Sequence, residues 1–189
     1  MSTYASTPRD RLLETARTLF LRDGVPRTGI NAVTTEADVA RMTLYNNFPS
    51  KEALVLAVFE QEAQRRRDAI EAAQAACGTG PEKALALFDV ALELAAHHGF
   101  RGCAFINLAI EAAAPDSAMH AVAKRHKDWI RENLRAHLED ADVADPDTLA
   151  EQICVLWDGG IVGAYVHGSD APLRRAQETA RTLLRAAAP

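Results

Sequence analysis

The stretch INAVTTEADVARMTLYNNFPSK, from Ile30 to Lys51, predicts two short helices joined by a tight turn, with a third helix starting behind them. Asn31 can cap the first helix, which we expect through Val33 to Ala37, because its side-chain oxygen can accept from free backbone N–H groups. Asp38 tolerates turn and left-handed conformations better than most residues, so it ends that helix. The second helix is expected from about Ala40 to Asn46. Two helices in this arrangement form a helix-turn-helix, a unit that reads DNA.

The sequence GINAVTTEADVARMTLYNNFPSKEAL at 29–54, preceded by the apolar helix RLLETARTLFLRDG at 11–24, resembles the TetR family of one-component transcriptional regulators. The resemblance covers about the first third of the chain, and its long motif is more specific than a bare helix-turn-helix spacing. Two positions depart from the family pattern. Asp38 stands where Gly is usual, which costs some strain but keeps the turn, and Asn47 stands where an aromatic residue or His is common.

The outward residues of the second helix suit base reading. Arg41 can make a bidentate contact with guanine, while Met42 and Thr43 can touch a thymine methyl group. The resemblance implies that Tyr45 contacts a phosphate through its hydroxyl, although its ring can also cover the small core, and that Lys51 approaches the DNA backbone. The residues expected to bind DNA are Thr28, Asn31, Arg41, Met42, Thr43, Tyr45, Asn46, Asn47 and Lys51.

Composition predicts a soluble, all-helical chain. Its 189 residues are 48% hydrophobic and 25% charged, and Ala, Leu, Glu and Arg dominate over strand-forming patterns. The net charge of −5 divides into +2 through Lys51 and −7 beyond it, which fits a DNA-binding head on an acidic body. In the absence of a signal-peptide pattern or an apolar run long enough for a membrane span, we expect a cytoplasmic protein with reduced cysteines.

Apolar periodicity predicts about nine helices in two domains, a helix-turn-helix DNA-binding domain at 8–53 and a ligand-binding and dimerisation bundle at 54–189. The GTGP run at 78–81 is the clearest helix breaker. Besides the two short helices, we expect helices at about 9–22, 50–76, 82–98, 103–113, 117–138, 148–167 and 172–187.

The unit LWDGGIVGAY at 156–165 predicts close helix packing, because glycines remove side chains along one helix and let another backbone approach. We therefore expect a homodimer through the last two helices, as the resemblance also implies. The residues assigned to that interface are Gly159, Gly160, Gly163, Leu173, Leu183 and Leu184.

Polar residues in the apolar body helices suggest a small-molecule site. Asn107 and Glu111 are spaced i, i+4 and share a helix face, and His126 and Asp158 lie on two later helices, so the four could line one cavity. The full candidate set for ligand binding is Cys103, Asn107, Glu111, His126, Trp129 and Asp158. Solvent-edge or purely structural positions are an equally open interpretation, and a carboxylate–imidazole metal site is a lesser one. Cys103 is either a reactive thiol or simple packing.

The function expected from these patterns is a ligand-responsive repressor that leaves a palindromic operator when a small-molecule effector binds. The resemblance implies this mechanism, with double-stranded DNA, an effector and a second copy as partners. Motifs of catalysis are lacking in the sequence, so we expect no enzyme and no cofactor. The alternatives are a helical-bundle protein with a metal or small-molecule site in its body, and an activator or corepressor-dependent regulator.

Overall fold

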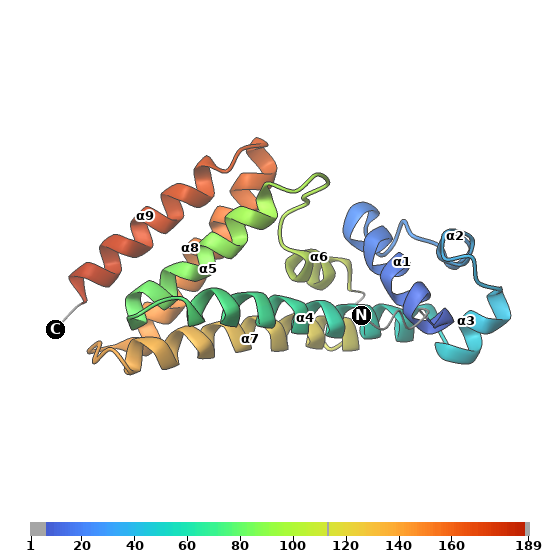
Figure 1. Ribbon diagram of the computed structural model, residues 1–189, viewed down its shortest axis with the longest axis horizontal. Coiled ribbons are helices and arrows are strands. Elements are labelled where there is room, and N and C mark those ends of the chain that lie inside the picture. The colour runs from blue at the N-terminus through green and yellow to red at the C-terminus, as the bar shows by residue number, and fades with distance from the viewer. Residues whose placement is uncertain (1–6, 113, 188–189) are drawn as a thin grey trace. The chain divides into compact units, whose positions relative to one another are not determined.

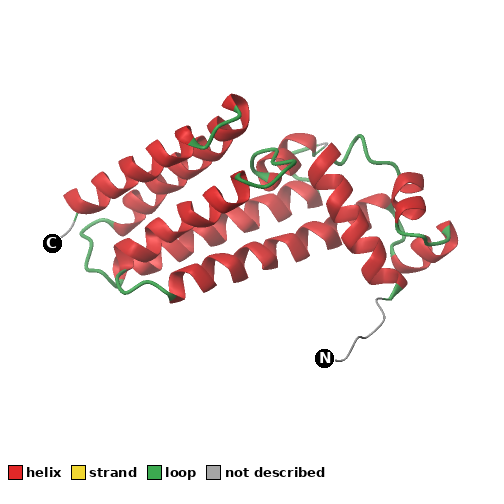
Figure 2. Ribbon diagram, turned by 45° about the horizontal axis from the view of Figure 1, so that its top comes forward, coloured by secondary structure: helices red, strands yellow, loops and turns green. Residues whose placement is uncertain are grey.

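A computed structural model describes residues 7–112 and 114–187 and confirms an all-α fold. Within these residues there are nine helices and no strand (Figures 1 and 2). They are α1 (Pro8–Asp23), α2 (Ile30–Glu36), α3 (Arg41–Asn47), α4 (Lys51–Ala75), α5 (Gly80–Ala95), α6 (Ala104–Glu111), α7 (Ala118–Glu139), α8 (Pro146–His167) and α9 (Ala171–Ala186). The expected helices are therefore all present, with shifted ends.

The chain divides into two compact units. Of the described residues, unit 1 comprises 7–64, 104–112 and 114–124, and unit 2 comprises 65–103 and 125–187. Helices α4 and α7 each contribute one part to each unit, and α6 belongs with α1, α2 and α3. This division by compactness has other boundaries than the domains expected at 8–53 and 54–189, which stay a prediction.

Helix α1 forms because its start, stop and apolar face are all encoded locally. The Thr7 side chain accepts from the Asp10 N–H while the Asp10 carboxylate accepts from the Thr7 N–H, and Pro8 occupies the first turn. Gly24, with φ of 90°, ends the helix. The buried face consists of Leu12, Leu13, Ala16, Leu19 and Phe20.

The two short helices begin elsewhere than expected. Helix α2 starts at Ile30 with Gly29 as its N-cap, so the prediction that Asn31 caps the helix is wrong: Asn31 already lies in the first turn and is exposed. Asp38 does occupy the left-handed region, with φ of 51°, and the chain re-enters a helix at Arg41. Leu44 and Phe48 are buried and fix α3 on the core of unit 1.

Two contacts tie α4 to its neighbours in unit 1. The Arg17 guanidinium of α1 donates to the buried Glu62 carboxylate of α4 at 2.7 Å. The rings of Phe59 on α4 and Phe105 on α6 meet edge to face with centroids 6.0 Å apart. Unit 1 therefore holds α1, α4 and α6 together.

In unit 2, α8 and α9 pack closely, and α5 contacts both. A Cβ atom at Gly160 would lie 2.9 Å from Leu173 Cδ1 and 3.0 Å from Ala176 Cβ, so the glycine lets α9 approach α8. The Trp157 indole donates to the Leu87 carbonyl at 3.2 Å, which joins α8 to α5. Close packing is thus confirmed at Gly160, but with a helix of the same chain.

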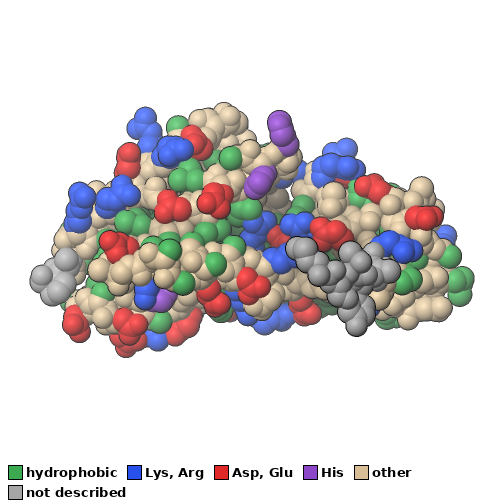
Figure 3. All heavy atoms as spheres, in the orientation of Figure 1, with side chains coloured by type: hydrophobic (Ala, Val, Ile, Leu, Met, Phe, Trp, Pro, Cys, Tyr) green, Lys and Arg blue, Asp and Glu red, His purple; other side chains and the backbone are tan. Residues whose placement is uncertain are grey.

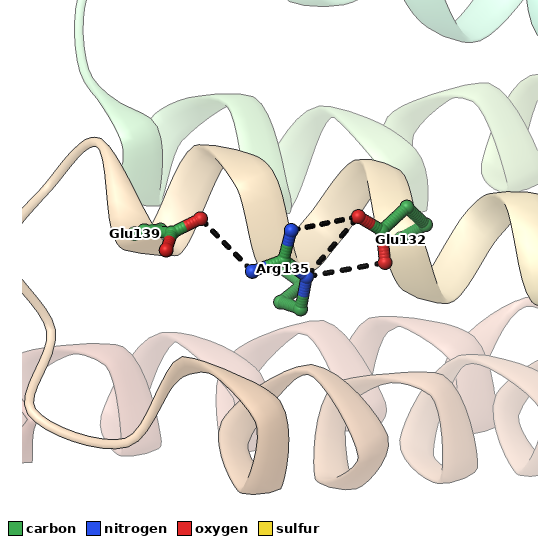
Figure 4. A network of polar contacts seen from close by, with 3 residues as sticks. All are labelled: Glu132, Arg135 and Glu139. Carbon is green, nitrogen blue, oxygen red and sulfur yellow. Dashed lines mark hydrogen bonds and ion pairs between the residues drawn. The ribbon is translucent and has the colours of Figure 1, made fainter.

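The outer face of α7 is charged. Arg135 donates to Glu132 one turn before it, at 2.7 Å, and to Glu139 one turn after it, at 2.9 Å (Figure 4). Pairs at i, i+3 and i, i+4 support a helix locally but contribute little when solvent screens them. This face is a solvated surface, and the opposite side of α7 carries the buried Ile130, Leu134 and Leu138.

Candidate nucleic-acid interface

Helix α3 presents a row of side chains to solvent. Met42 is 70% exposed, Tyr45 is 37% exposed, and Arg41 and Asn46 are also exposed. The Arg41 guanidinium lies over the Tyr45 ring, 5.6 Å from its centroid, a cation–π geometry that orients the arginine. With Leu44 buried behind them, these residues lie on a rigid helix that can enter a major groove.

Asn47, at the end of α3, is engaged locally. Its side-chain amide donates to the Thr43 carbonyl at 2.7 Å, which supports the last turn of the helix. The amide oxygen of the same side chain remains an acceptor for a partner. Thr43 itself is half-buried.

Two of the residues expected to contact DNA bond to the connection between α1 and α2. We call α1, α2 and α3 together the head. Thr28 is only 3% exposed, and its hydroxyl donates to the Gly24 carbonyl at 2.9 Å. The Lys51 ammonium donates to the Val25 carbonyl at 2.6 Å, and burial lowers the pKa of Lys51. In this structure each side chain donates to a backbone carbonyl at the start of the α1–α2 connection, and contact of either residue with DNA stays a prediction.

Arg11 on α1 is a residue that sequence reasoning missed. Its Nε donates to the Ala37 carbonyl at 3.2 Å, at the end of α2. The two residues are 26 positions apart, so no local motif could have revealed the contact. Arg11 therefore helps to place α2 although it lies outside the helix-turn-helix stretch.

The surface charge of the head is mixed. On the face shown in Figure 3, basic and acidic side chains alternate over α1 to α3 rather than gathering in one basic patch. This agrees with an excess of only +2 through Lys51. Sequence preference must then come from the α3 side chains that can reach base edges, while affinity also depends on charge and on backbone N–H groups that contact phosphates.

His126 in unit 2 is buried without being charged. It is 2% exposed, and its pKa is lowered to about 3 by burial and by the nearby positive charges of Lys127, Arg67 and Arg66. A neutral imidazole offers one donor and one acceptor. The ring is therefore a polar but uncharged group in the interior of the body.

Two cation–π pairs and one ion pair lie in unit 2, on α7 and on its partners α4 and α8. The Lys127 ammonium pairs with the Asp158 carboxylate and lies 4.6 Å from the centroid of the Trp157 ring. The Arg67 guanidinium lies 5.3 Å from the centroid of the Trp129 ring. We call His126, Lys127, Trp129, Trp157 and Asp158 the body cluster.

The six residues expected to bind a ligand fall in both units, and their common role in ligand binding stays a prediction. Asn107 and Glu111 belong to unit 1, while Cys103, His126, Trp129 and Asp158 belong to unit 2. The Glu111 carboxylate accepts from the Val25 N–H at 3.0 Å and so serves the head. Cys103 is a buried free thiol. Among the residues that the structure describes, no group of three or more His, Cys, Asp or Glu side chains could hold a metal ion.

Most of the residues expected at the dimer interface pack against other residues of the same chain. Gly160 and Leu173 are buried between α8 and α9, a Cβ at Gly163 would lie 2.8 Å from Pro172, and Leu184 is buried on α9. Leu183 is half-exposed. Gly159 differs, because a Cβ there would meet no described atom within 4 Å. Beside it runs an exposed apolar stripe on α8, at i, i+7 and i+11, made by Val155, Val162 and Val166.

Comparison with known proteins explains this architecture. The profile described as "Bacterial regulatory proteins, tetR family" matches residues 12–58, and the "Tetracyclin repressor-like, C-terminal domain" profile matches residues 80–180. The second match alone spans more than half of the chain. The chain belongs to the TetR family.

Individual relatives agree with that assignment. A TetR-family transcriptional regulator from Streptomyces coelicolor superposes with a TM-score of 0.88 at 27% identity, over 96% of each chain. The transcriptional repressor DhaR of Mycobacterium sp. (strain GP1) is 25% identical over 89% of this chain and 88% of its own length. The transcriptional regulator UidR of Escherichia coli is 35% identical, but the match spans only 34% of this chain and 33% of UidR.

The chain is thus a TetR-family regulator with a helix-turn-helix head, and the relatives named above are transcriptional regulators. The alternative function, a helical-bundle protein with a metal or small-molecule site in its body, is not favoured. In the described part of the chain, no helix is long and apolar enough to cross a membrane.

Proposed function

We propose that this TetR-family protein is a repressor that binds a pseudo-palindromic operator as a homodimer and leaves it when a small-molecule effector binds. The observation that carries the proposal is the exposed face of α3, where Arg41, Met42 and Tyr45 are held outward by the buried Leu44. Arg41 suits guanine, Met42 suits a thymine methyl group, and Tyr45 suits a phosphate.

The operator experiment measures fluorescence anisotropy of the purified protein with its own upstream DNA at two salt concentrations. Wild type is expected to bind with a steep salt dependence, because binding releases counterions from phosphates. Arg41→Ala should weaken binding and relax preference at one base pair, while Tyr45→Ala should weaken all sequences alike. Arg175→Ala, at an exposed arginine of α9, is the matched control and should bind like wild type. Absence of salt-dependent binding to any promoter fragment would overturn the proposal.

Dimerisation through α8 is supported by the exposed stripe of Val155, Val162 and Val166, with Gly159 leaving room for a close approach. A second copy related by two-fold symmetry would bury the same stripe on both chains. Val162→Glu should then shift the protein to monomer in sedimentation, because each interface would bury two charges. Thr179→Glu, on the exposed face of α9, is the control and should remain dimeric. If the Val162→Glu variant remains dimeric, the dimer interface does not include this stripe.

The effector site is proposed at the body cluster in unit 2. Neutral His126 can donate or accept a hydrogen bond, Asp158 can accept one, and two indoles offer apolar faces. The chain has two tryptophans, Trp129 and Trp157, and both lie in this cluster, so intrinsic fluorescence reports on it directly. A compound that releases the operator should change this fluorescence, and Asp158→Asn should weaken both effects together. Operator release without any change in fluorescence would exclude the cluster.

A further inference from the structure

The backbone of Val25 is held from two sides by charged side chains. Its N–H donates to Glu111 Oε2 at 3.0 Å, and its carbonyl accepts from Lys51 Nζ at 2.6 Å. Val25 is buried and directly follows Gly24, which ends α1. Three parts of unit 1 therefore meet at one residue: the α1–α2 connection, the first residue of α4 and the last residue of α6.

Both contacts are of a strong kind. A hydrogen bond to an ionised group is roughly twice as strong as one between neutral groups, and both of these bonds are partly buried. Burial lowers the pKa of Lys51, while the negative charge of Glu111 acts in the opposite direction, so the two side chains support each other across the same backbone segment. Neither charge is left in the interior without an opposite one nearby.

The segment held in this way leads into the DNA-reading helices. From Val25 the chain runs through Thr28, whose buried hydroxyl bonds back to the Gly24 carbonyl, to Gly29, the N-cap of α2. A shift of Val25 would therefore be passed to the start of α2 through a short connection that is bonded at both ends. The position of α2 in turn fixes the turn that leads to α3.

We propose that Glu111 and Lys51 are positioning residues for operator binding, which act together through the backbone of Val25 and do not contact the DNA themselves. This inference rests on the proposed function, since its main readout is operator affinity. It assigns Glu111 to the head rather than to the effector site. It also gives the Lys51 ammonium an internal role in place of a phosphate contact.

The salt dependence of binding separates the two roles of Lys51. Each phosphate contact contributes about 0.9 to the slope of log affinity against log salt concentration. A Lys51→Met variant that has lost only positioning should bind roughly tenfold more weakly with the wild-type slope. A variant that has lost a phosphate contact should bind more weakly with a slope smaller by about one.

The experiment compares Glu111→Gln, Lys51→Met and the double variant on the same operator fragment. Each single variant should lose roughly tenfold in operator affinity. The double variant should lose little more than the single variant that binds more weakly, because both substitutions release the same backbone segment at Val25. Glu71→Gln, at an exposed carboxylate of α4, is the control and should match wild type. The proposal is overturned if Glu111→Gln binds like wild type, or if Lys51→Met lowers the salt slope by about one.

Amide hydrogen exchange at Val25, measured by NMR without DNA, tests independently whether Glu111 bonds the Val25 backbone. Exchange of the Val25 N–H should be faster in Glu111→Gln than in wild type, whereas buried Ile153 in unit 2 should be unchanged. Because the glutamine amide oxygen can still accept from the Val25 N–H, Glu111→Ala, which removes the acceptor, is measured beside it. Equal exchange at Val25 in Glu111→Ala would refute the contact even if operator binding had failed for other reasons. If Glu111→Gln does not fold, Glu111→Asp takes its place, because it keeps the charge but shortens the reach to Val25.

Discussion

The guanidinium of Arg11 donates from Nη2 to the backbone carbonyl of Asp38, 3.3 Å away, at the turn between α2 and α3. Asp38 has a φ of 51°, a conformation that a residue other than glycine adopts at some cost. The same guanidinium also bonds the Ala37 carbonyl, so one side chain of α1 holds two successive carbonyls of the turn. The angle between the two reading helices therefore depends on a residue outside them.

Replacing Arg11 with methionine should weaken operator binding several-fold while leaving the helix content unchanged. Methionine keeps the apolar stem but removes both donors, so the turn loses its support and α3 samples more orientations. Arg11→Lys should recover only part of the affinity, because an ammonium lacks the planar fork that reaches two carbonyls. Anisotropy with the operator and circular dichroism together measure this. Wild-type affinity in Arg11→Met would show that the turn is stable without the contact.

Base reading by Met42 can be tested by changing the operator instead of the protein. Replacing thymine by deoxyuridine at single operator positions removes one methyl group, and burial of such a group is worth about 0.8 kcal/mol. At one position in each half-site, this replacement should therefore lower the affinity of the wild-type protein about fourfold. With Met42→Ala the same replacement should have no effect, because the apolar partner is gone. Equal losses for both proteins would assign that methyl group to another residue.

The sequence predicted features that depend on neighbouring residues, but not contacts between residues far apart along the chain. The left-handed turn at Asp38 and the approximate bounds of α1 follow from neighbours within a few residues, and both were correctly predicted. The contacts of Lys51 and Glu111 with Val25 span 26 and 86 positions, so no local motif could predict them, and the expected roles of the two residues in DNA and ligand binding stay predictions. Glycine spacing on α8 did predict close helix packing. It could not reveal that the neighbour is α9 of the same chain.

Burial of neutral His126 predicts acid sensitivity. Its pKa is about 3 in the folded protein against 6.5 for an ordinary histidine, so between these values the unfolded chain binds more protons. The free energy of unfolding should therefore fall as pH drops below about 6.5, with a slope of up to about 1.4 kcal/mol per pH unit. His126→Gln should flatten this slope between pH 6.5 and 5 in urea titrations. The exposed His167→Gln is the control, and an unchanged slope in His126→Gln would contradict the assignment.

Adjacent glycines on α8 give the sharpest test of the packing in unit 2. A Cβ at Gly160 would lie 2.9 Å from Leu173 Cδ1 and 3.1 Å from Leu173 Cα, so Gly160→Ala should push α9 away and cost about 1 to 3 kcal/mol of stability. At Gly159 a Cβ would meet no described atom within 4 Å, so Gly159→Ala should gain up to about 1 kcal/mol from helix propensity.

Urea unfolding of the two variants at equal protein concentration measures the difference, which should have opposite signs for neighbouring positions. The sign for Gly159→Ala carries a second piece of information. If a second copy packs against the α8 stripe beside Gly159, the added methyl group meets that copy and weakens the dimer. Gly159→Ala should then be more stable than wild type at low protein concentration. At high concentration, where wild type is dimeric, the variant should lose dimer. Equal destabilisation by both substitutions at every concentration would mean that α8 and α9 are packed in another register.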